Sequence, residues 1–187
     1  MMRDFVRVAV FLCYLIALAT TTLAELNDRL GPGLDHPAIQ YRIGPLEDPV
    51  SALIMKLQSG DAQLHFEGPQ GYLKSLIEAL KVPVESQIAV FSKTSLQKDL
   101  IEPRNPRTIF FNDSVSVAWM FGGFIELASH DPEKGVIFFT LPQQPSDRPM
   151  FQRRNDCLAC HFSDQSLGVA RFWQALVTQA SACSSLV

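Results

Sequence analysis

The spacing of short apolar runs in the second half of the chain constrains its fold more than any other feature. These runs occupy 88–91, 108–111, 115–120, 124–128 and 136–140, and turn-forming residues separate them, among them Asn112-Asp113 and Phe121-Gly122-Gly123. Short spacers of this kind favour antiparallel hairpins, because a parallel connection needs a long crossover. This half of the sequence therefore predicts an antiparallel β-meander.

Two helical patterns precede the strands. In the first, Asp48 is suited to the N-cap and Pro49 to the first turn, where its missing N–H leaves no bond unmade. Apolar residues then repeat at helical spacing from Val50 to Leu57, and Gly60 is suited to end the helix.

The second helical pattern runs from Leu73 to Leu80 and is stopped by Pro83, and the alternation at 62–66 predicts a short strand between the two helices. Helices followed by a meander indicate an α+β fold, in which two amphipathic helices pack on one face of an antiparallel sheet. We expect this domain to cover 48–141, after an extended lead-in at 25–47 that is rich in Gly and Pro.

The N-terminus has the pattern of a secretory signal peptide. Arg3 and Arg7 form a basic start, residues 8–19 are uncharged and mostly apolar, and small residues lead up to Ala24. The apolar stretch is shorter than the roughly 20 residues that a membrane-spanning helix needs. We therefore expect removal of 1–24 and a periplasmic protein without stable membrane insertion; an uncleaved signal anchor is the alternative.

Charge and cysteine content exclude two further classes. The formal net charge of −3 offers no electrostatic basis for binding nucleic acid or an anionic membrane surface. Outside the predicted signal peptide only Cys157, Cys160 and Cys183 remain, and three thiols cannot all pair with one another. The mature chain is also long enough to bury a normal core. A disulfide-stapled domain is therefore excluded.

The pentapeptide Cys157-Leu158-Ala159-Cys160-His161 is the segment that specifies a chemistry. Two thiols three positions apart can each add to a vinyl group at one edge of a haem, and the imidazole that follows can bind the iron. We therefore predict Cys157 and Cys160 as covalent attachment residues for haem c and His161 as an axial ligand of the haem iron.

Zinc and a redox dithiol are the alternative readings of this motif. A structural zinc site needs four ligands, and no second Cys-x-x-Cys or His-x-His cluster supplies the fourth. A thioredoxin-type dithiol is expected at the start of a helix that follows a strand in a βαβ unit. Here the motif follows a meander and a proline-broken linker, which favours haem.

The motif lies on a segment of its own at 142–187, which we expect to consist of a linker and a short haem-attachment region. Prolines between 142 and 149 disfavour regular structure in the linker. Arg153 and Arg154 are either partners for the haem propionates, to which guanidinium groups are suited, or solvated linker residues.

A second axial ligand must come from upstream, because neither Met nor His follows His161. The candidates are His36, His65, His130, Met55, Met120 and Met150. His130 is expected at the start of a turn, and Met55 and Met120 are expected as core residues. The residues favour no candidate, and a five-coordinate iron is the alternative.

Several stretches together resemble a group of exported bacterial c-type cytochrome-like proteins that have a single Cys-x-x-Cys-His motif and no assigned activity. The similar stretches are Pro83-Val84-Glu85-Ser86-Gln87, Val90 to Ser95, Pro103-Arg104 to Pro106-Arg107, Phe110-Phe111-Asn112-Asp113 and Asp156 to His161. The resemblance covers about 48–169. It implies a periplasmic haem protein with a large non-haem N-terminal part, and a longer continuation after Val169 than this chain carries.

We expect a periplasmic c-type haem protein that transfers electrons to a partner protein. One alternative is a five-coordinate haem enzyme or sensor for peroxide or a small gas. A second is a non-haem interaction module in which the motif holds zinc.

Overall fold

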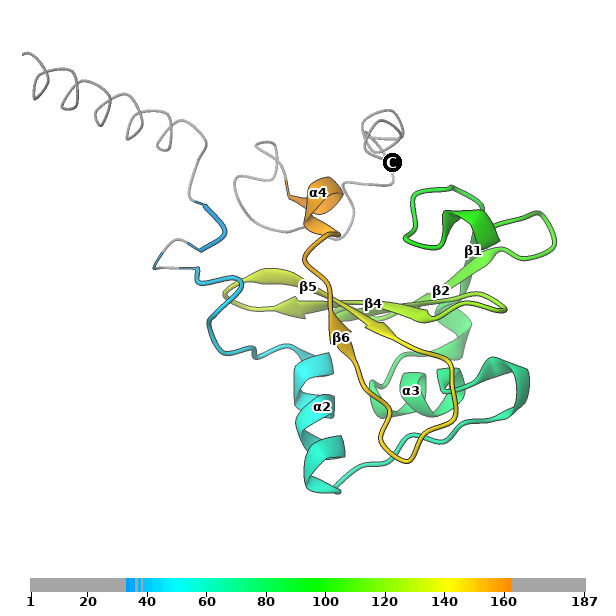
Figure 1. Cartoon of the computed structure of the whole chain (residues 1–187), viewed down its shortest axis with the longest axis horizontal. Helices are drawn as coiled ribbons and strands as arrows, with labels where there is room; N and C mark the ends of the chain where they lie inside the picture. The colour runs from blue at the N-terminus through cyan, green and yellow to red at the C-terminus, as the bar shows by residue number, and fades with distance from the viewer. Residues whose placement is uncertain (1–32, 36, 38, 163–187) are drawn as a thin grey trace, which may run out of the picture.

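The centre of the computed structural model, which describes residues 33–35, 37 and 39–162, is a six-stranded sheet (Figure 1). The strands lie side by side in chain order: β1 Ile88–Val90, β2 Arg107–Phe111, β3 Val115–Trp119, β4 Ile125–Asp131, β5 Gly135–Leu141 and β6 Gln152–Arg153. Every neighbouring pair is antiparallel. The predicted meander is confirmed, and the described chain is a mixed α+β structure.

Helix α2, Pro49–Ser59, begins and ends at the residues that the sequence predicts. The Asp48 carboxylate accepts the backbone N–H groups of Val50 and Ser51 at 3.0 and 3.1 Å, so two amides that the helix cannot bond internally are satisfied. Gly60 ends the helix at φ 83°, a left-handed conformation that glycine adopts at little cost.

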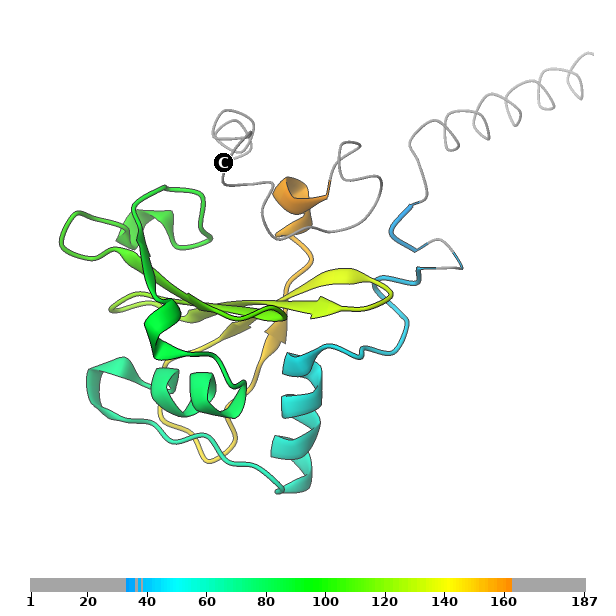
Figure 2. The ribbon, with the colours of Figure 1, turned by 180° about the vertical axis from the view of Figure 1, so that it is seen from behind.

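Helix α3, Leu73–Ala79, confirms the second helical pattern, and three 3₁₀ turns accompany the two helices. These turns are η1 Gly68–Gln70, η2 Val84–Ser86 and η3 Lys98–Leu100. Helices α2 and α3 lie on the same side of the sheet, which is clearest from behind (Figure 2). We call this side the helix face and the opposite side the second face.

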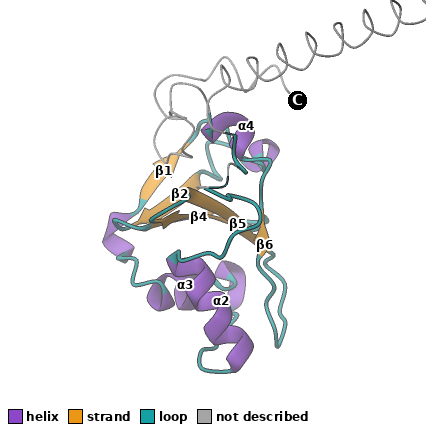
Figure 3. Ribbon diagram, turned by 90° about the vertical axis from the view of Figure 1, so that its left-hand side faces the viewer, coloured by secondary structure: helices purple, strands orange, loops and turns teal. Residues whose placement is uncertain are grey.

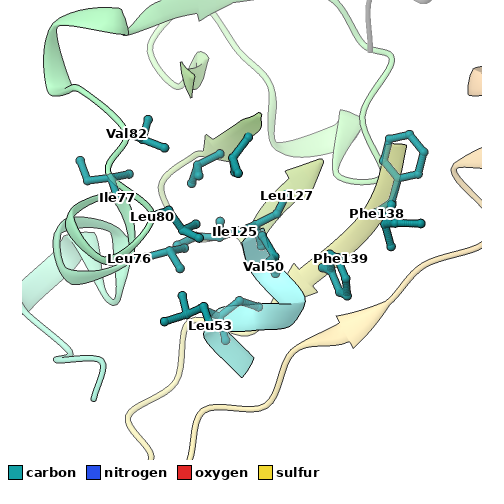
Figure 4. Close-up of a cluster of buried hydrophobic side chains, with 14 of the residues drawn as sticks. Val50, Leu53, Leu76, Ile77, Leu80, Val82, Ile125, Leu127, Phe138 and Phe139 are labelled. Carbon is teal, nitrogen blue, oxygen red and sulfur yellow. The ribbon is translucent and has the colours of Figure 1, made fainter. Parts of the chain in front are cut away.

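The main core lies between the helix face and the two helices. Val50 and Leu53 of α2 and Leu76 of α3 are at most 5% exposed. They point toward Leu127 and Ile125 of β4 (Figure 4). These side chains come from the apolar stripes that the helical spacing predicts, so the amphipathic pattern and the core agree.

Strand β5 is buried along its whole length, whereas β4 alternates. All seven residues of β5 are buried, but on β4 the residues between the buried ones are half-buried or, for His130, exposed. Because successive strand residues point to opposite faces, β5 must be covered on both sides. The second face therefore has a cover of its own over β5.

The predicted strand at 62–66 is wrong, although its alternation is real. Leu64 is 5% exposed, and its neighbours Gln63 and His65 are exposed. The segment pairs with no strand of the described structure, because the Ser75 hydroxyl donates to the His65 carbonyl and accepts the His65 N–H, both at 3.0 Å. The Ser75 side chain thus makes the two hydrogen bonds to His65 that a neighbouring strand would otherwise make.

Two further predictions about the sheet need correction. Strand β4 continues through His130 and Asp131, which pair with Val136 and Gly135, so His130 does not begin a turn. The linker prediction missed β6, which pairs with Phe139 and Thr140. The Asp131 carboxylate accepts the N–H groups of Glu133 and Lys134 at 3.0 and 2.9 Å and so shortens the real turn to three residues.

Candidate functional site

The Cys157–His161 pentapeptide lies on the second face of the sheet, over β5. Strand β6 runs along the edge of β5, and the Arg154 N–H then donates to the Phe138 carbonyl at 2.8 Å. The chain next turns upward into helix α4, Leu158–His161. Figures 1 and 3 both show α4 on the opposite side of the sheet from α2 and α3. Helix α4 is thus part of the second cover that β5 requires.

The motif forms a single helical turn. The N–H groups of Cys160 and His161 both donate to the Cys157 carbonyl, at 3.2 and 3.1 Å. Positions i, i+3 and i+4 share one side of a helix, so the two cysteines and the histidine lie together. Ala159, on the other side of the turn, is exposed. The side of α4 that carries the two cysteines and the histidine is half-buried.

Two contacts hold this turn against the second face. Leu158 is 6% exposed and belongs to the hydrophobic core cluster, against which Cys157 also packs. The His161 imidazole lies 4.8 Å from the Phe138 ring, centroid to centroid, at an angle of 47°. Phe138 points to the second face because its neighbours on β5 point to the helix face. The aromatic ring of β5 thus fixes the place of His161.

The environment of Cys157 is that of an unreactive thiol. Burial raises the pKa of Cys157 to about 12, and the nearby carboxylates of Asp156 and Glu126 act in the same direction. Catalytic dithiols have a lowered pKa, because the thiolate is the attacking species. Cys160 is disulfide-bonded and Cys157 is a free thiol, so the two are not joined to each other. These properties argue against a thioredoxin-type site.

The two arginines before the motif are both engaged within the protein. The Arg153 guanidinium donates to the carbonyl groups of Tyr41 and Arg42 and lies over the Tyr41 ring, 5.1 Å from its centroid. Arg154 is paired with Asp156, with N–O distances of 3.0 and 2.5 Å. Arg153 therefore anchors the lead-in segment to β6. Arg154 is held beside the motif, three residues before Cys157, by its pairing with Asp156.

A row of uncharged side chains, which we call the floor, crosses the second face beside α4, and the sequence did not predict it. It runs from Phe111 through Ser116 and Ala128 to Phe138, because these residues pair in turn across neighbouring strands. The unbroken apolar run of β5 was the available signal, because a strand without polar alternation is buried on both sides. The three side chains of the motif beside this floor, Cys157, Cys160 and His161, are each half-buried.

A buried ion pair borders this floor. The Arg107 guanidinium lies 3.3 Å from the Glu126 carboxylate, and their side chains are 14% and 16% exposed. Glu126 also accepts the Ser95 hydroxyl at 2.7 Å and the Leu96 N–H at 3.1 Å. The carboxylate is therefore fully occupied with fixing the 92–101 loop to β4.

The structure separates the candidates for a second iron ligand. Met120 is 1% exposed, so its assignment to the core is confirmed, whereas the same prediction for Met55, which is 60% exposed, is wrong. Met150 is 75% exposed. His65 is bonded through its backbone to Ser75, next to α3 and thus on the helix side.

Several sequence predictions concern residues outside the described ones. These are the signal peptide at 1–24, His36, Cys183 and the segment from 163 onward. Within the described residues, no helix is long and apolar enough to cross a membrane. The same part of the chain contains no cluster of three or more His, Cys, Asp or Glu side chains arranged to hold a metal ion.

The side chains of Cys157, Cys160 and His161 are of the types that covalent haem attachment uses. Two sulfur atoms one turn apart, followed at once by an imidazole, are what a covalently attached haem requires. Each thioether forms when a cysteine thiol adds across a haem vinyl group, so a thiol reductant must first supply the two electrons that open the Cys160 disulfide. No protein-family model, curated protein or solved structure matches the chain.

Proposed function

We propose that the protein is an exported c-type haem protein that transfers electrons. Cys157 and Cys160 would carry haem c through thioether bonds, and His161 would be an axial ligand of its iron. The observation that carries the proposal is that these three side chains share one side of a helical turn whose histidine ring lies against Phe138 of the second face. When bound, haem supplies one-electron oxidation and reduction.

The surrounding residues support this role by anchoring the helical turn and contacting the imidazole. Leu158 anchors the turn in the core, and the Phe138 ring limits the rotation of His161. The uncharged floor beside α4 disfavours additional charge on a bound redox group, which is one way in which a protein tunes a reduction potential. Fixed surroundings also reduce the reorganisation that accompanies each electron transfer.

Covalent attachment can be tested directly in cells. The full chain, produced in a bacterium together with cytochrome c maturation proteins, should give a haem-stained band that survives denaturation. Replacing Cys157 and Cys160 together with Ser should abolish the band, because no thioether can form. The matched control, Cys183→Ser, should retain it, since Cys183 is outside the motif. A zinc-bearing, stain-negative wild-type protein would contradict the proposal.

Electron transfer is distinguished from sensing or catalysis at an open iron position by adding carbon monoxide to the reduced holoprotein. An electron carrier should be reversibly reduced and oxidised, and its absorption spectrum should not change with the gas. A large, rapid spectral change would instead support a sensor or enzyme that binds peroxide or a small gas. The proposed partner of the carrier is a second redox protein.

Export is the part of the proposal that rests on the N-terminal sequence alone. The protein isolated from a periplasmic extract should begin at Glu25, which N-terminal sequencing would establish. A protein that keeps 1–24 and remains with the membrane fraction would support the uncleaved anchor instead.

A further inference from the structure

We infer that His130 is the second axial ligand of the haem iron, which would make the site bis-histidine. This inference rests on the proposed function, because it concerns the same haem. It depends on where the sheet register places His130 relative to His161, and both side chains are on the second face.

The register of the β4–β5 hairpin brings His130 next to the ring that contacts His161. His130 pairs with Val136 and Ala128 pairs with Phe138, so His130 and Phe138 are diagonal neighbours on one face. Diagonal neighbours in an antiparallel pair have Cβ atoms roughly 7 Å apart. Phe138 in turn lies 4.8 Å from the His161 ring. His130 and His161 are therefore both neighbours of Phe138 on the second face.

The chain path brings α4 toward the end of β5 that carries His130's partner. Phe139 pairs with Arg153, and the Phe138 carbonyl accepts the Arg154 N–H. Strand β6 therefore runs toward the end of β5 that carries Val136, the residue opposite His130, before the chain turns upward into α4. Seen along the strands, α4 lies above β4 and β5 (Figure 3).

The properties of His130 suit an iron ligand better than those of Met120 and His65. Its backbone is fixed in β4, where its N–H donates to the Ser114 carbonyl at 2.8 Å, while its side chain is exposed on the second face. A neutral imidazole nitrogen binds haem iron readily. Met120 is buried, and His65 lies on the helix side. An exposed strand histidine without a function is the alternative that the experiment must exclude.

The test compares the absorption and electron paramagnetic resonance spectra of the full-length holoprotein and two variants. The wild type should have low-spin iron. His130→Ala should become high-spin, and free imidazole should restore the low-spin spectrum because it fills the vacated position. The matched control, His65→Ala, removes an exposed histidine from the other side of the sheet and should retain the wild-type spectrum.

A second variant measures the same ligand through the reduction potential. His130→Met should raise the midpoint potential relative to wild type, because histidine–methionine ligation favours the reduced iron more than two histidines do. A low-spin His130→Ala protein or a high-spin wild type would overturn the inference while leaving covalent haem in place. A wild type without covalent haem would overturn both the inference and the proposed function.

Discussion

The docking of α4 on the sheet can be measured through the reactivity of Cys157 in the protein made without haem. Burial raises the pKa of this thiol to about 12. Because only the thiolate reacts with iodoacetamide, the docked thiol should be protected at mildly alkaline pH. Leu158→Ala should weaken this protection, since Leu158 is the buried side chain that anchors the turn.

The expected magnitudes follow from the burial and the pKa. Near pH 8 a thiol with a pKa of 12 is ionised about a thousandfold less than one at the ordinary value of 9.0. Truncating a buried leucine to alanine costs about 2 kcal/mol or more, and 2 kcal/mol is a factor of about 30 in an equilibrium. Leu158→Ala should therefore raise the alkylation rate about 30-fold, with the rate of the unfolded chain as its upper limit.

The assay is a time course of alkylation in which the peptide that contains Cys157 is quantified by mass spectrometry. The other cysteines do not interfere, because mass spectrometry assigns each modification to one cysteine within its peptide. Leu100→Ala is the matched control: Leu100 is 39% exposed, and its truncation should leave the rate unchanged. Alkylation of the native wild type at the rate of the denatured chain would refute the docked position of α4.

Two further predictions concern stability. Asp48→Ala should lower the free energy of unfolding by about 2 kcal/mol, because it leaves the Ser51 amide without its acceptor and the Val50 amide with only the Ser129 hydroxyl. Asp48→Asn should cost less. Urea denaturation measures both variants, and equal effects would contradict the capping role. Burial raises the pKa of Tyr41 to about 12, so its contribution to stability is complete below about pH 10 and is lost as the pH rises through 12. Tyr41→Phe should lower the free energy of unfolding by about 1 kcal/mol at neutral pH, because it removes the hydrogen bond to the Val136 carbonyl. The variant should also lose less stability than wild type as the pH rises above 10. An equal loss in both proteins would show that other groups cause it.

Local signals in the sequence were sufficient for the helices and the hairpins. Helix α2 starts at Asp48 and stops at Gly60 because a carboxylate cap and a left-handed glycine act within one turn of the residues that they affect. The turns of the meander are equally local. Strand β6 was missed because its only reason to form is the edge of β5, which is distant in sequence.

The position of the motif on the sheet could not be predicted from the sequence either, because it depends on contacts between residues that are distant in the chain. The candidate residues are evident from the motif. Nothing in the sequence near Cys157, however, indicates that α4 contacts Phe138 on the side of the sheet opposite α2 and α3. His130 was predicted in a turn, because Asp131 and the residues after it have turn chemistry. In the structure Asp131 is still in β4, and its carboxylate caps the turn that follows. That shift of two residues moves His130 onto the face that carries the motif.

The central claim is that this chain carries haem through Cys157 and Cys160, and mass spectrometry of the mature protein tests it most directly. After production with cytochrome c maturation proteins, the peptide that contains 157–161 should be heavier by one haem, bound through both cysteines. An unmodified peptide from a fully folded protein would contradict the claim.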